Sequence, residues 1–244
     1  MKIFITGASS GIGEELARSY AVKENELILL ARREEKLKTL QSELLPHAKS
    51  VEIIVADLTL FDELQEKIKK IGAVDIAVLN AGISLGHSSE ITPFDDFKKL
   101  YEVNLFSNHA ILEILLPHFK EQRSGKIVFI SSLASLISMP SSKAYSSSKR
   151  ALNAYAEAIR YKYKPHGVDV INILPGFIKS ELTYKNSFHM PFLLSTKEGV
   201  ALIKKAIDTN KKFYPFPLRF YLIILFFNSL PQFLRDKIVN SLNN

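Results

Sequence analysis

Short apolar runs alternate with longer amphipathic segments along most of the chain, and this alternation limits the possible folds more than any other feature. The short runs are rich in β-branched side chains, as buried strands are, and cover residues 3–5, 27–31, 51–56, 76–79, 126–130 and 168–174. The segments with helical periodicity cover residues 11–23, 34–45, 60–71, 94–120 and 145–162. Strands that alternate with helices predict an α/β fold with a doubly wound parallel sheet and helices on both faces.

The composition excludes several other classes of protein. Of the 244 residues, 47% are hydrophobic and 23% are charged, which supports one domain with a large core rather than a disordered chain. The chain has no Cys, so a disulfide framework, a Cys-based zinc site and a catalytic thiol are excluded. The six His are scattered without metal-ligand spacing, and no nucleic-acid-binding module is recognisable, so we expect neither a metal nor a nucleic-acid partner.

A glycine cluster at the end of the first predicted strand is the first motif that indicates chemistry. Gly7, Gly11 and Gly13 stand in the eight residues T-G-A-S-S-G-I-G, which lead into a predicted helix. Glycines at such a turn allow positive φ angles and a close approach of the backbone to a pyrophosphate at the helix N-terminus. Tight packing of a helix on a strand can require the same residues, but the strand–turn–helix context favours nucleotide binding.

Further motifs follow the glycine cluster in a fixed order. Asn80-Ala81-Gly82 follows the fourth predicted strand, Tyr145 and Lys149 form a Y-x-x-x-K pattern, and Pro175-Gly176 follows the sixth strand. With these motifs the chain resembles the short-chain dehydrogenase/reductase family up to about residue 211. The resemblance implies a Rossmann-type fold, a nicotinamide cofactor, and a catalytic set made of Asn104, Ser132, Tyr145 and Lys149.

The Tyr–Lys pair also has a chemical rationale of its own. Tyr145 and Lys149 are four residues apart on a predicted helix and therefore share one face. A free Tyr has a pKa of about 10, and a nearby ammonium group together with a nicotinium charge is expected to lower it toward neutrality. Tyr145 can then exchange a proton with the substrate oxygen while a hydride moves to or from the nicotinamide.

Ser132 follows the strand at 126–130 and is expected at the carboxyl edge of the sheet, where ligands of open α/β folds bind. There it would hold the substrate oxygen, with the adjacent Ser131 as a rival. For Asn104, the resemblance implies that it holds a water molecule that links Lys149 to solvent. For Asn80, it implies a structural role in bracing the central strand.

The end of the second predicted strand bears on the choice of cofactor. Dinucleotide folds that prefer NAD place a carboxylate there, whereas this chain has Arg32 and Arg33. An arginine pairs with a 2′-phosphate that a carboxylate would repel. We therefore expect NADP(H) rather than NAD(H), with Arg32 as the main contact, Ser9 as a further one, and Arg33 either a contact or a solvated residue of the first helical turn.

The resemblance implies further contacts to the cofactor. Asp57-Leu58 would meet the adenine edge, although Asp57 also suits a helix N-cap. Ile178 would meet the carboxamide through its backbone, and Ser180 stands where the family usually has Thr. The complete expected cofactor set is Gly7, Ser9, Ser10, Gly11, Ile12, Gly13, Arg32, Arg33, Asp57, Leu58, Asn80, Ala81, Gly82, Tyr145, Lys149, Pro175, Gly176, Ile178 and Ser180.

Residues 181–194 are predicted to form a substrate loop. Its large apolar side chains either line a pocket for an apolar or medium-sized substrate or pack the loop onto the core, and they are Tyr184, Phe188, Met190, Phe192 and Leu193. The expected function is an oxidoreductase that moves a hydride between NADP(H) and a carbonyl/alcohol substrate. The alternative is a non-catalytic NADP(H)-binding sensor or partner-binding protein of the same fold.

The chain is expected to be one domain over 1–244, with a catalytic core at 1–210 and a hydrophobic, basic tail at 211–244. The net charge is +7, and the tail contributes five Lys/Arg against one Asp. Residues 220–227 are apolar around the whole helix circumference, so this extension must be covered on every side. A partner subunit in a homodimer or homotetramer, the substrate pocket, and a membrane surface that contacts residues 213–234 are the three possible covers. No secretory signal precedes the first strand, so the expected location is cytoplasmic, with possible attachment to a membrane through the tail.

Overall fold

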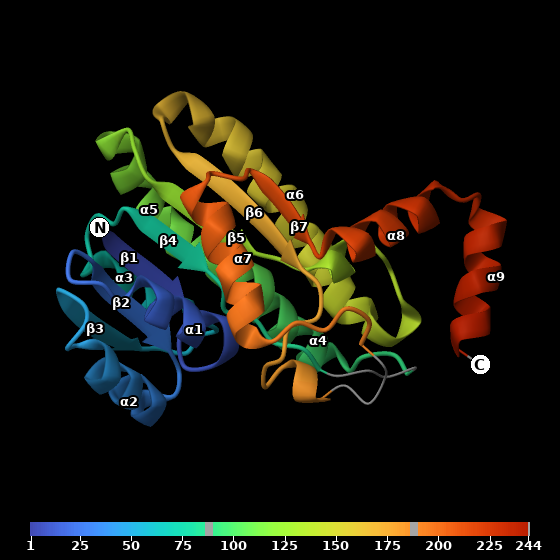
Figure 1. Ribbon diagram of the computed structural model, residues 1–244, viewed down its shortest axis with the longest axis horizontal. Coiled ribbons are helices and arrows are strands. Elements are labelled where there is room, and N and C mark those ends of the chain that lie inside the picture. Colours follow the sequence, from blue (N-terminus) through green and yellow to red (C-terminus); the bar gives the residue numbers. More distant parts are fainter. Residues whose placement is uncertain (86–89, 186–189, 244) are drawn as a thin grey trace.

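One parallel sheet organises the computed structural model, which describes residues 1–85, 90–185 and 190–243 (Figure 1). Its strands are β1 (Lys2–Thr6), β2 (Glu26–Ala31), β3 (Ser50–Val55), β4 (Ile76–Leu79), β5 (Lys126–Ile130), β6 (Asp169–Pro175) and β7 (Phe213–Phe216). Their order across the sheet is β3-β2-β1-β4-β5-β6-β7, and every neighbouring pair is parallel. The predicted Rossmann-type fold is therefore confirmed.

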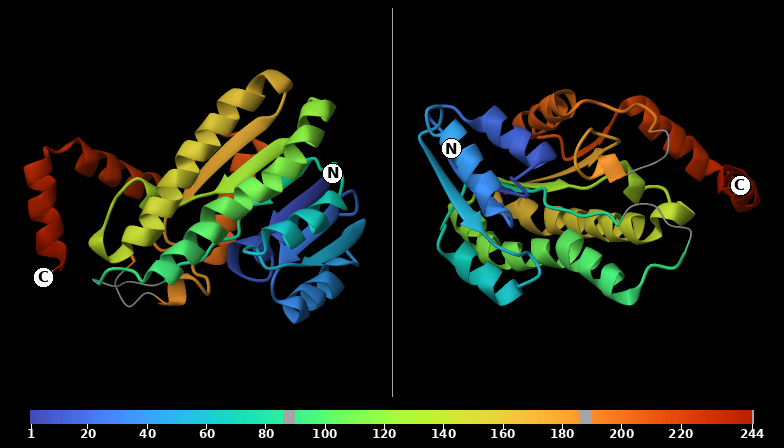
Figure 2. Two further views of the ribbon diagram at one scale, coloured as in Figure 1. Left: turned by 180° about the vertical axis from the view of Figure 1, so that it is seen from behind. Right: turned by 90° about the horizontal axis from the view of Figure 1, so that it is seen from below.

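Helices cover both faces of the sheet (Figure 2). Their bounds are α1 (Gly11–Tyr20), α2 (Glu34–Leu44), α3 (Phe61–Lys69), α4 (Phe94–Tyr101), α5 (Ser107–Gln122), α6 (Lys143–Tyr163), α7 (Thr196–Asp208), α8 (Leu218–Ser229) and α9 (Gln232–Asn243). Helices α1, α2 and α7 pack on one face with Ile3 and Ile5, whereas α3, α5 and α6 pack on the other with Phe4. Successive residues of a strand point to opposite faces, which explains why Ile3, Phe4 and Ile5 at the centre of β1 are all apolar.

Strand β7 is not among the predicted strands, because its residues were assigned to the tail. It pairs with β6, with Asn172 opposite Phe213 and Pro175 opposite Phe216. Pro215 makes the sequence atypical of a central strand, but β7 lies at the edge of the sheet, where proline is tolerated. Helix α7 was also not predicted, although a capping box between Ser195 and Glu198 marks its start.

The helical segment predicted over 94–120 contains a local irregularity. Residues Glu102–Phe106 form one π-helical turn between α4 and α5. Such turns are rare and occur often at functional sites. Here the turn contains the buried Asn104, so the interruption bears on the candidate site described below.

Helices α8 and α9 form an arm at one end of the molecule, and α9 stands clear of the sheet and its covering helices in both views (Figures 1 and 2). In the part of the chain that the structure describes, only one side of α8 is covered, where the buried Ile224 packs with Leu133 and Leu174. The described residues therefore do not by themselves provide the cover on every side that the sequence analysis expected for this segment. No helix of the described residues is long and apolar enough to cross a bilayer.

Candidate active site

The glycine-rich turn connects β1 to α1 at the point where the strand order reverses, between β1 and β4. Gly7 has a φ of +69°, and a Cβ on Gly13 would lie 2.4 Å from the Gly7 carbonyl oxygen. A side chain at Gly13 would therefore collide with the backbone of the turn. The sequence motif reflects this close approach of the backbone to itself.

Thr6 and Asn80 join the turn to the end of β4. The backbone amides of Asn80 and Ala81 both donate to the Thr6 hydroxyl at 3.0 Å. The Asn80 side chain donates to the Thr6 carbonyl, also at 3.0 Å. This is the structural bracing that the sequence analysis expected of Asn80.

A cavity of about 450 Å³ opens at the carboxyl ends of the strands. The predicted residues that line it are Gly7, Ser9, Ser10, Gly11, Ile12, Arg32, Arg33, Asp57, Leu58, Asn80, Ala81, Gly82, Ser132, Tyr145, Lys149, Pro175, Gly176, Ile178 and Ser180. Gly13 and Asn104 are not among the residues that line it. Residues that the sequence analysis did not assign to the site also line it, and these include Ile83, Ser84, Lys99, Val103 and Thr183.

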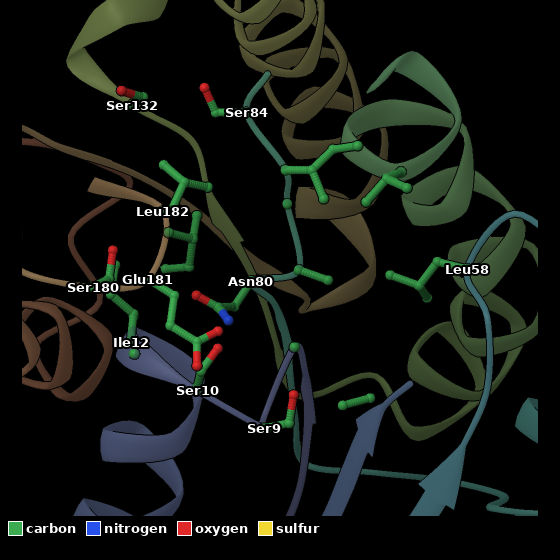
Figure 3. A pocket seen from close by; sticks show the side chains of 18 of the residues that line it. Ser9, Ser10, Ile12, Leu58, Asn80, Ser84, Ser132, Ser180, Glu181 and Leu182 are labelled. Atoms are coloured by element: carbon green, nitrogen blue, oxygen red, sulfur yellow. The ribbon is translucent and has the colours of Figure 1, made fainter. Parts of the chain in front are cut away.

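Figure 3 shows how the two ends of the cavity are built. Ser9 of the glycine-rich turn lies toward one end of the view, and Asn80 lies near the centre. Ser84 and Ser132 lie at the opposite end from Ser9. The cavity therefore extends from the glycine-rich turn to the residues that follow β4 and β5.

Tyr145, Lys149 and Ser132 lie together at the end of the cavity opposite Ser9. The Lys149 Nζ atom lies 6.0 Å from the centre of the Tyr145 ring and donates to the Ile130 carbonyl at 2.9 Å. Burial lowers the pKa of Lys149 to about 8. Burial also raises the pKa of Tyr145, and a hydrogen bond with Ser132 only partly opposes this. In the free protein the pKa of Tyr145 therefore moves in the direction opposite to the expected lowering.

The structure separates the two neighbouring serines. The Ser132 hydroxyl bonds to Tyr145 and accepts from the Ala134 amide at 3.1 Å. The Ser131 side chain is buried and donates instead to the Lys149 carbonyl at 3.3 Å. Ser132 is thus the serine directed at Tyr145.

Asn104 is fully buried beside Gly82. Its Oδ1 accepts from the Ile83 amide at 2.8 Å, and its Nδ2 donates to the Ile83 carbonyl and the Ser148 hydroxyl, both at 3.1 Å. A Cβ on Gly82 would lie 3.2 Å from this Oδ1 and 3.3 Å from the Lys149 Nζ. Asn104 therefore fixes the segment after β4 against α6 and lies near Lys149, while its water-holding role remains a prediction.

Basic residues gather at the end of β2. Arg33 donates through Nε to the Ser9 hydroxyl at 3.1 Å and through Nη1 to Glu181 at 2.7 Å. Lys36, which the sequence analysis did not assign to the site, donates to the other oxygen of Glu181 at 2.6 Å. Arg32 is largely exposed and lies 3.7 Å from Asp57. Arg33 is thus more firmly held than a solvated residue of a first helical turn.

Comparison with known proteins identifies the chain. Residues 1–190 match the family model described as short chain dehydrogenase. The chain belongs to the short-chain dehydrogenase/reductase family. It is therefore an oxidoreductase with the fold that binds a nicotinamide cofactor in this family.

Individual relatives agree with this assignment. An uncharacterised oxidoreductase of Myxococcus xanthus is 34% identical over 217 residues, which cover 87% of this chain and 86% of that protein. A short-chain dehydrogenase from Streptomyces avermitilis is 26% identical, with a TM-score of 0.81 over 99% of this chain and 94% of its own. A short-chain dehydrogenase from Sphingobium yanoikuyae, solved with NADPH, shares the fold at 22% identity, with a TM-score of 0.83 over 95% and 96% of the two chains.

Asp57 of this short-chain dehydrogenase/reductase does not cap α3, because the N-cap of that helix is Leu60. The Asp57 carboxylate instead accepts from the amide and the hydroxyl of Thr59, at 3.0 and 2.9 Å. Burial raises the pKa of Asp57, but the bonds from Thr59 and the charge of Arg32 outweigh it, so the net shift is downward. The N-cap interpretation was therefore wrong, and the carboxylate stays ionised at the wall of the cavity.

Thr183, which the sequence analysis did not assign to the site, holds the conformation of the segment after β6. The Thr183 hydroxyl donates to the Ile178 carbonyl and accepts from the Ser180 amide, both at 2.9 Å. Of the predicted substrate loop, Glu181 and Leu182 line the cavity, whereas Tyr184 is 79% exposed. Phe192 packs on Phe220 of α8, and Phe188 lies outside the described residues.

A second, smaller cavity of about 190 Å³ shares Tyr145 with the first. Apolar side chains before and within α4 line it together with residues 141–144, and the apolar ones are Leu85, Ile91, Pro93 and Leu100. The sequence analysis placed the substrate pocket only at residues 181–194. In the described residues, no group of three or more His, Cys, Asp or Glu could hold a metal ion.

Proposed function

We propose that this family member is an NADP(H)-dependent oxidoreductase that interconverts a carbonyl and an alcohol, with Tyr145 as the general acid/base. The observation that carries the proposal is the convergence of Tyr145, Ser132 and Lys149 at the end of the cavity away from Ser9. The same cavity begins at the glycine-rich turn, so one continuous space offers both phosphate-binding and proton-transfer groups.

The shape of the cavity supports a dinucleotide. Gly7, Gly11, Gly82 and Gly176 line the cavity without side chains, so the backbone can approach a bound pyrophosphate. Arg32 and Arg33 follow β2, where a carboxylate would select NAD(H), and together with Lys36 of α2 they offer a cationic site for a 2′-phosphate. The NADPH complex of the structural relative from Sphingobium yanoikuyae is consistent with this choice.

The nicotinamide, when bound, supplies or accepts the hydride. Tyr145 gives a proton to the substrate oxygen in the reductive direction and takes it back in the oxidative one. A raised pKa keeps its phenol protonated in the free protein, which suits the reductive direction. Ser132 donates a hydrogen bond to the same oxygen, and the Lys149 ammonium, protonated for the most part at neutral pH, stabilises the phenolate that remains.

The substrate is proposed to be apolar or medium-sized. Leu85, Ile91, Pro93 and Leu100 line the smaller cavity next to Tyr145, and Leu182 lines the larger one. Asp96 and Lys143 also line the smaller cavity, so we propose that the substrate carries one polar group that contacts them. This arrangement favours a substrate that presents an apolar body beyond its carbonyl group.

A Tyr145→Phe variant tests the proposal. We expect it to bind NADPH with unchanged affinity, measured by fluorescence titration, and to lose at least about 1000-fold in turnover on a carbonyl found by a substrate panel. Tyr161→Phe is the matched control, because Tyr161 lies on the same helix but is exposed and bonds to Glu157. Full turnover of Tyr145→Phe would refute the mechanism. NADPH binding without turnover by the wild type on any carbonyl or alcohol would favour the sensor alternative.

A further inference from the structure

The arm formed by α8 and α9 presents an apolar surface that none of the described residues covers. The outward side chains of α8 are Leu218, Leu222, Ile223, Leu225 and Phe226, all of them exposed. Phe226 is 68% exposed, and Phe233 at the start of α9 is 69% exposed. A helix on the surface of a water-soluble domain normally turns polar residues outward, so these side chains indicate a binding surface.

The opposite side of α8 is anchored firmly. Ile224 is buried against Leu133 and Leu174, and the Asn228 side chain donates to the Leu136 carbonyl at 2.8 Å. Phe220 stacks against Phe177 at a centroid distance of 5.9 Å. The helix is therefore held on the segments that follow Ser132 and Pro175, and its outward face has a fixed orientation.

Charge distinguishes between the surfaces that could cover this face. Exposed basic residues flank the apolar side chains, namely Lys211, Lys212, Arg219 and Lys237. Residues 211–244 carry five Lys/Arg against one Asp, and the whole chain is also positive at +7. A second copy would bring two basic arms together, whereas anionic lipid offers both apolar depth and opposite charge.

We propose that α8 and the start of α9 dock this protein onto an anionic membrane surface. Helix α8 has 12 residues, well below the roughly 20 needed to span a bilayer, so it would lie in the interfacial plane. Its outward apolar face enters the headgroup boundary, and the flanking lysines and arginines contact lipid phosphates. The docked surface lies next to the segment after β6, because Phe220 contacts both Phe177 and Phe192.

Flotation with lipid vesicles tests the docking. We expect the full chain to float with vesicles of phosphatidylcholine and phosphatidylglycerol and to bind at least tenfold more weakly to phosphatidylcholine alone. Neutralising Lys211, Lys212 and Arg219 to Gln should weaken binding on the order of 100-fold, at about fivefold per charge. A Leu222→Ser/Phe226→Ser variant should lose binding while it retains its thermal stability, since both side chains are exposed.

The matched control is Leu45→Ser/Leu60→Ser, which removes two exposed leucines beside α2 and α3, far from the arm (Figure 1). It should float like the wild type, and so should Tyr145→Phe, because docking does not depend on the proposed chemistry. Absence of wild-type binding to anionic vesicles would overturn the proposal. A second copy would cover the face instead if the wild type did not bind vesicles and formed a dimer that the Leu222→Ser/Phe226→Ser variant did not form. Light scattering measures this, and that result would also overturn the proposal.

Discussion

The Nη1 atom of Arg33 lies 2.7 Å from Oε2 of Glu181, which ties the end of β2 to the segment after β6 across the mouth of the cavity. The two residues are 148 positions apart in the chain. Lys36 binds the other oxygen of the same carboxylate at 2.6 Å. Hydrogen bonds from Lys36 and then Arg33 hold the pKa of Glu181 at about 2, against the opposing effect of burial. The carboxylate therefore occupies the cationic site proposed for a 2′-phosphate.

Replacing Glu181 by Gln should strengthen NADPH binding. The substitution removes a negative charge that competes for Arg33 and Lys36, and a partly exposed pair of this kind is worth about 1 kcal/mol or less. We expect the Kd for NADPH to fall by roughly two- to fivefold and the Kd for NADH to change little. Glu66→Gln, which breaks an exposed Glu–Lys pair on α3, is the control. A weaker affinity for NADPH in Glu181→Gln would contradict the competition.

The same carboxylate makes a contribution that depends on pH. Its pKa is lower in the folded than in the unfolded state, so the stabilisation by Glu181 is present above its ordinary pKa of 4.5 and is lost as the pH falls toward about 2. The stability difference between the wild type and Glu181→Gln should therefore shrink between pH 4.5 and 2, measured by urea unfolding. A difference that grows as the pH falls would have the wrong sign.

The two serines after β5 should respond differently to removal of their hydroxyl groups. Ser132→Ala should lower kcat by about 100-fold, because the donor directed at Tyr145 is lost. Ser131→Ala removes only a bond to the Lys149 carbonyl and should cost about 1 kcal/mol of stability with a smaller effect on kcat. Steady-state kinetics measures kcat for both variants, and an equal loss of kcat in the two would show that Ser132 has no special role in catalysis.

Lys149→Met should stabilise the free protein at neutral pH while it abolishes turnover. Burial lowers the pKa of Lys149 from 10.5 to about 8, so the buried ammonium costs about 3 kcal/mol below pH 8. Loss of the hydrogen bond to the Ile130 carbonyl reduces the expected gain in stability of the variant by about 1 kcal/mol. The cost is relieved as the pH rises from 8 to 10.5, because the folded state releases this proton before the unfolded state does. The gain should therefore vanish toward pH 10.5.

Urea unfolding at several pH values measures this gain. Lys126→Met is the control, because Lys126 also donates to a backbone carbonyl, that of Ile207, but remains partly exposed. A Lys149→Met protein that is less stable than the wild type at pH 7 would show that the buried ammonium is a net stabiliser of the fold.

Gly13→Ala should destabilise the fold far more than Gly72→Ala. A Cβ at Gly13 would lie 2.4 Å from the Gly7 carbonyl oxygen, and the backbone of the turn would have to move to avoid the collision. We therefore expect the free energy of unfolding to fall by about 3 kcal/mol and NADPH binding to be lost. Gly72 has a φ of +63° but nothing within 4 Å, so Ala there should cost only about 1 kcal/mol of backbone strain. Chemical denaturation of both variants tests the ranking.

Local sequence was sufficient for most elements of the sheet. The predicted bounds of β4 and β5 agree with the structure, because continuous β-branched runs between polar residues are typical of buried parallel strands. Strand β7 was missed because its identity depends on pairing with β6 at an edge, where Pro215 is permitted. The π turn at Asn104 was missed because no local pattern distinguishes it from the helices on either side.

The sequence by itself determined the order of the motifs, the fold, the family, and the residues that reach the carboxyl edge of the sheet. Only the tertiary structure decided what surrounds them. It directed Ser132 rather than Ser131 at Tyr145, paired Arg33 with Glu181, and buried Lys149 so that its pKa falls. Motif spacing follows from the regular geometry of strands and helices, whereas burial and ion pairing depend on side chains far apart in the chain, which only the packed fold brings together.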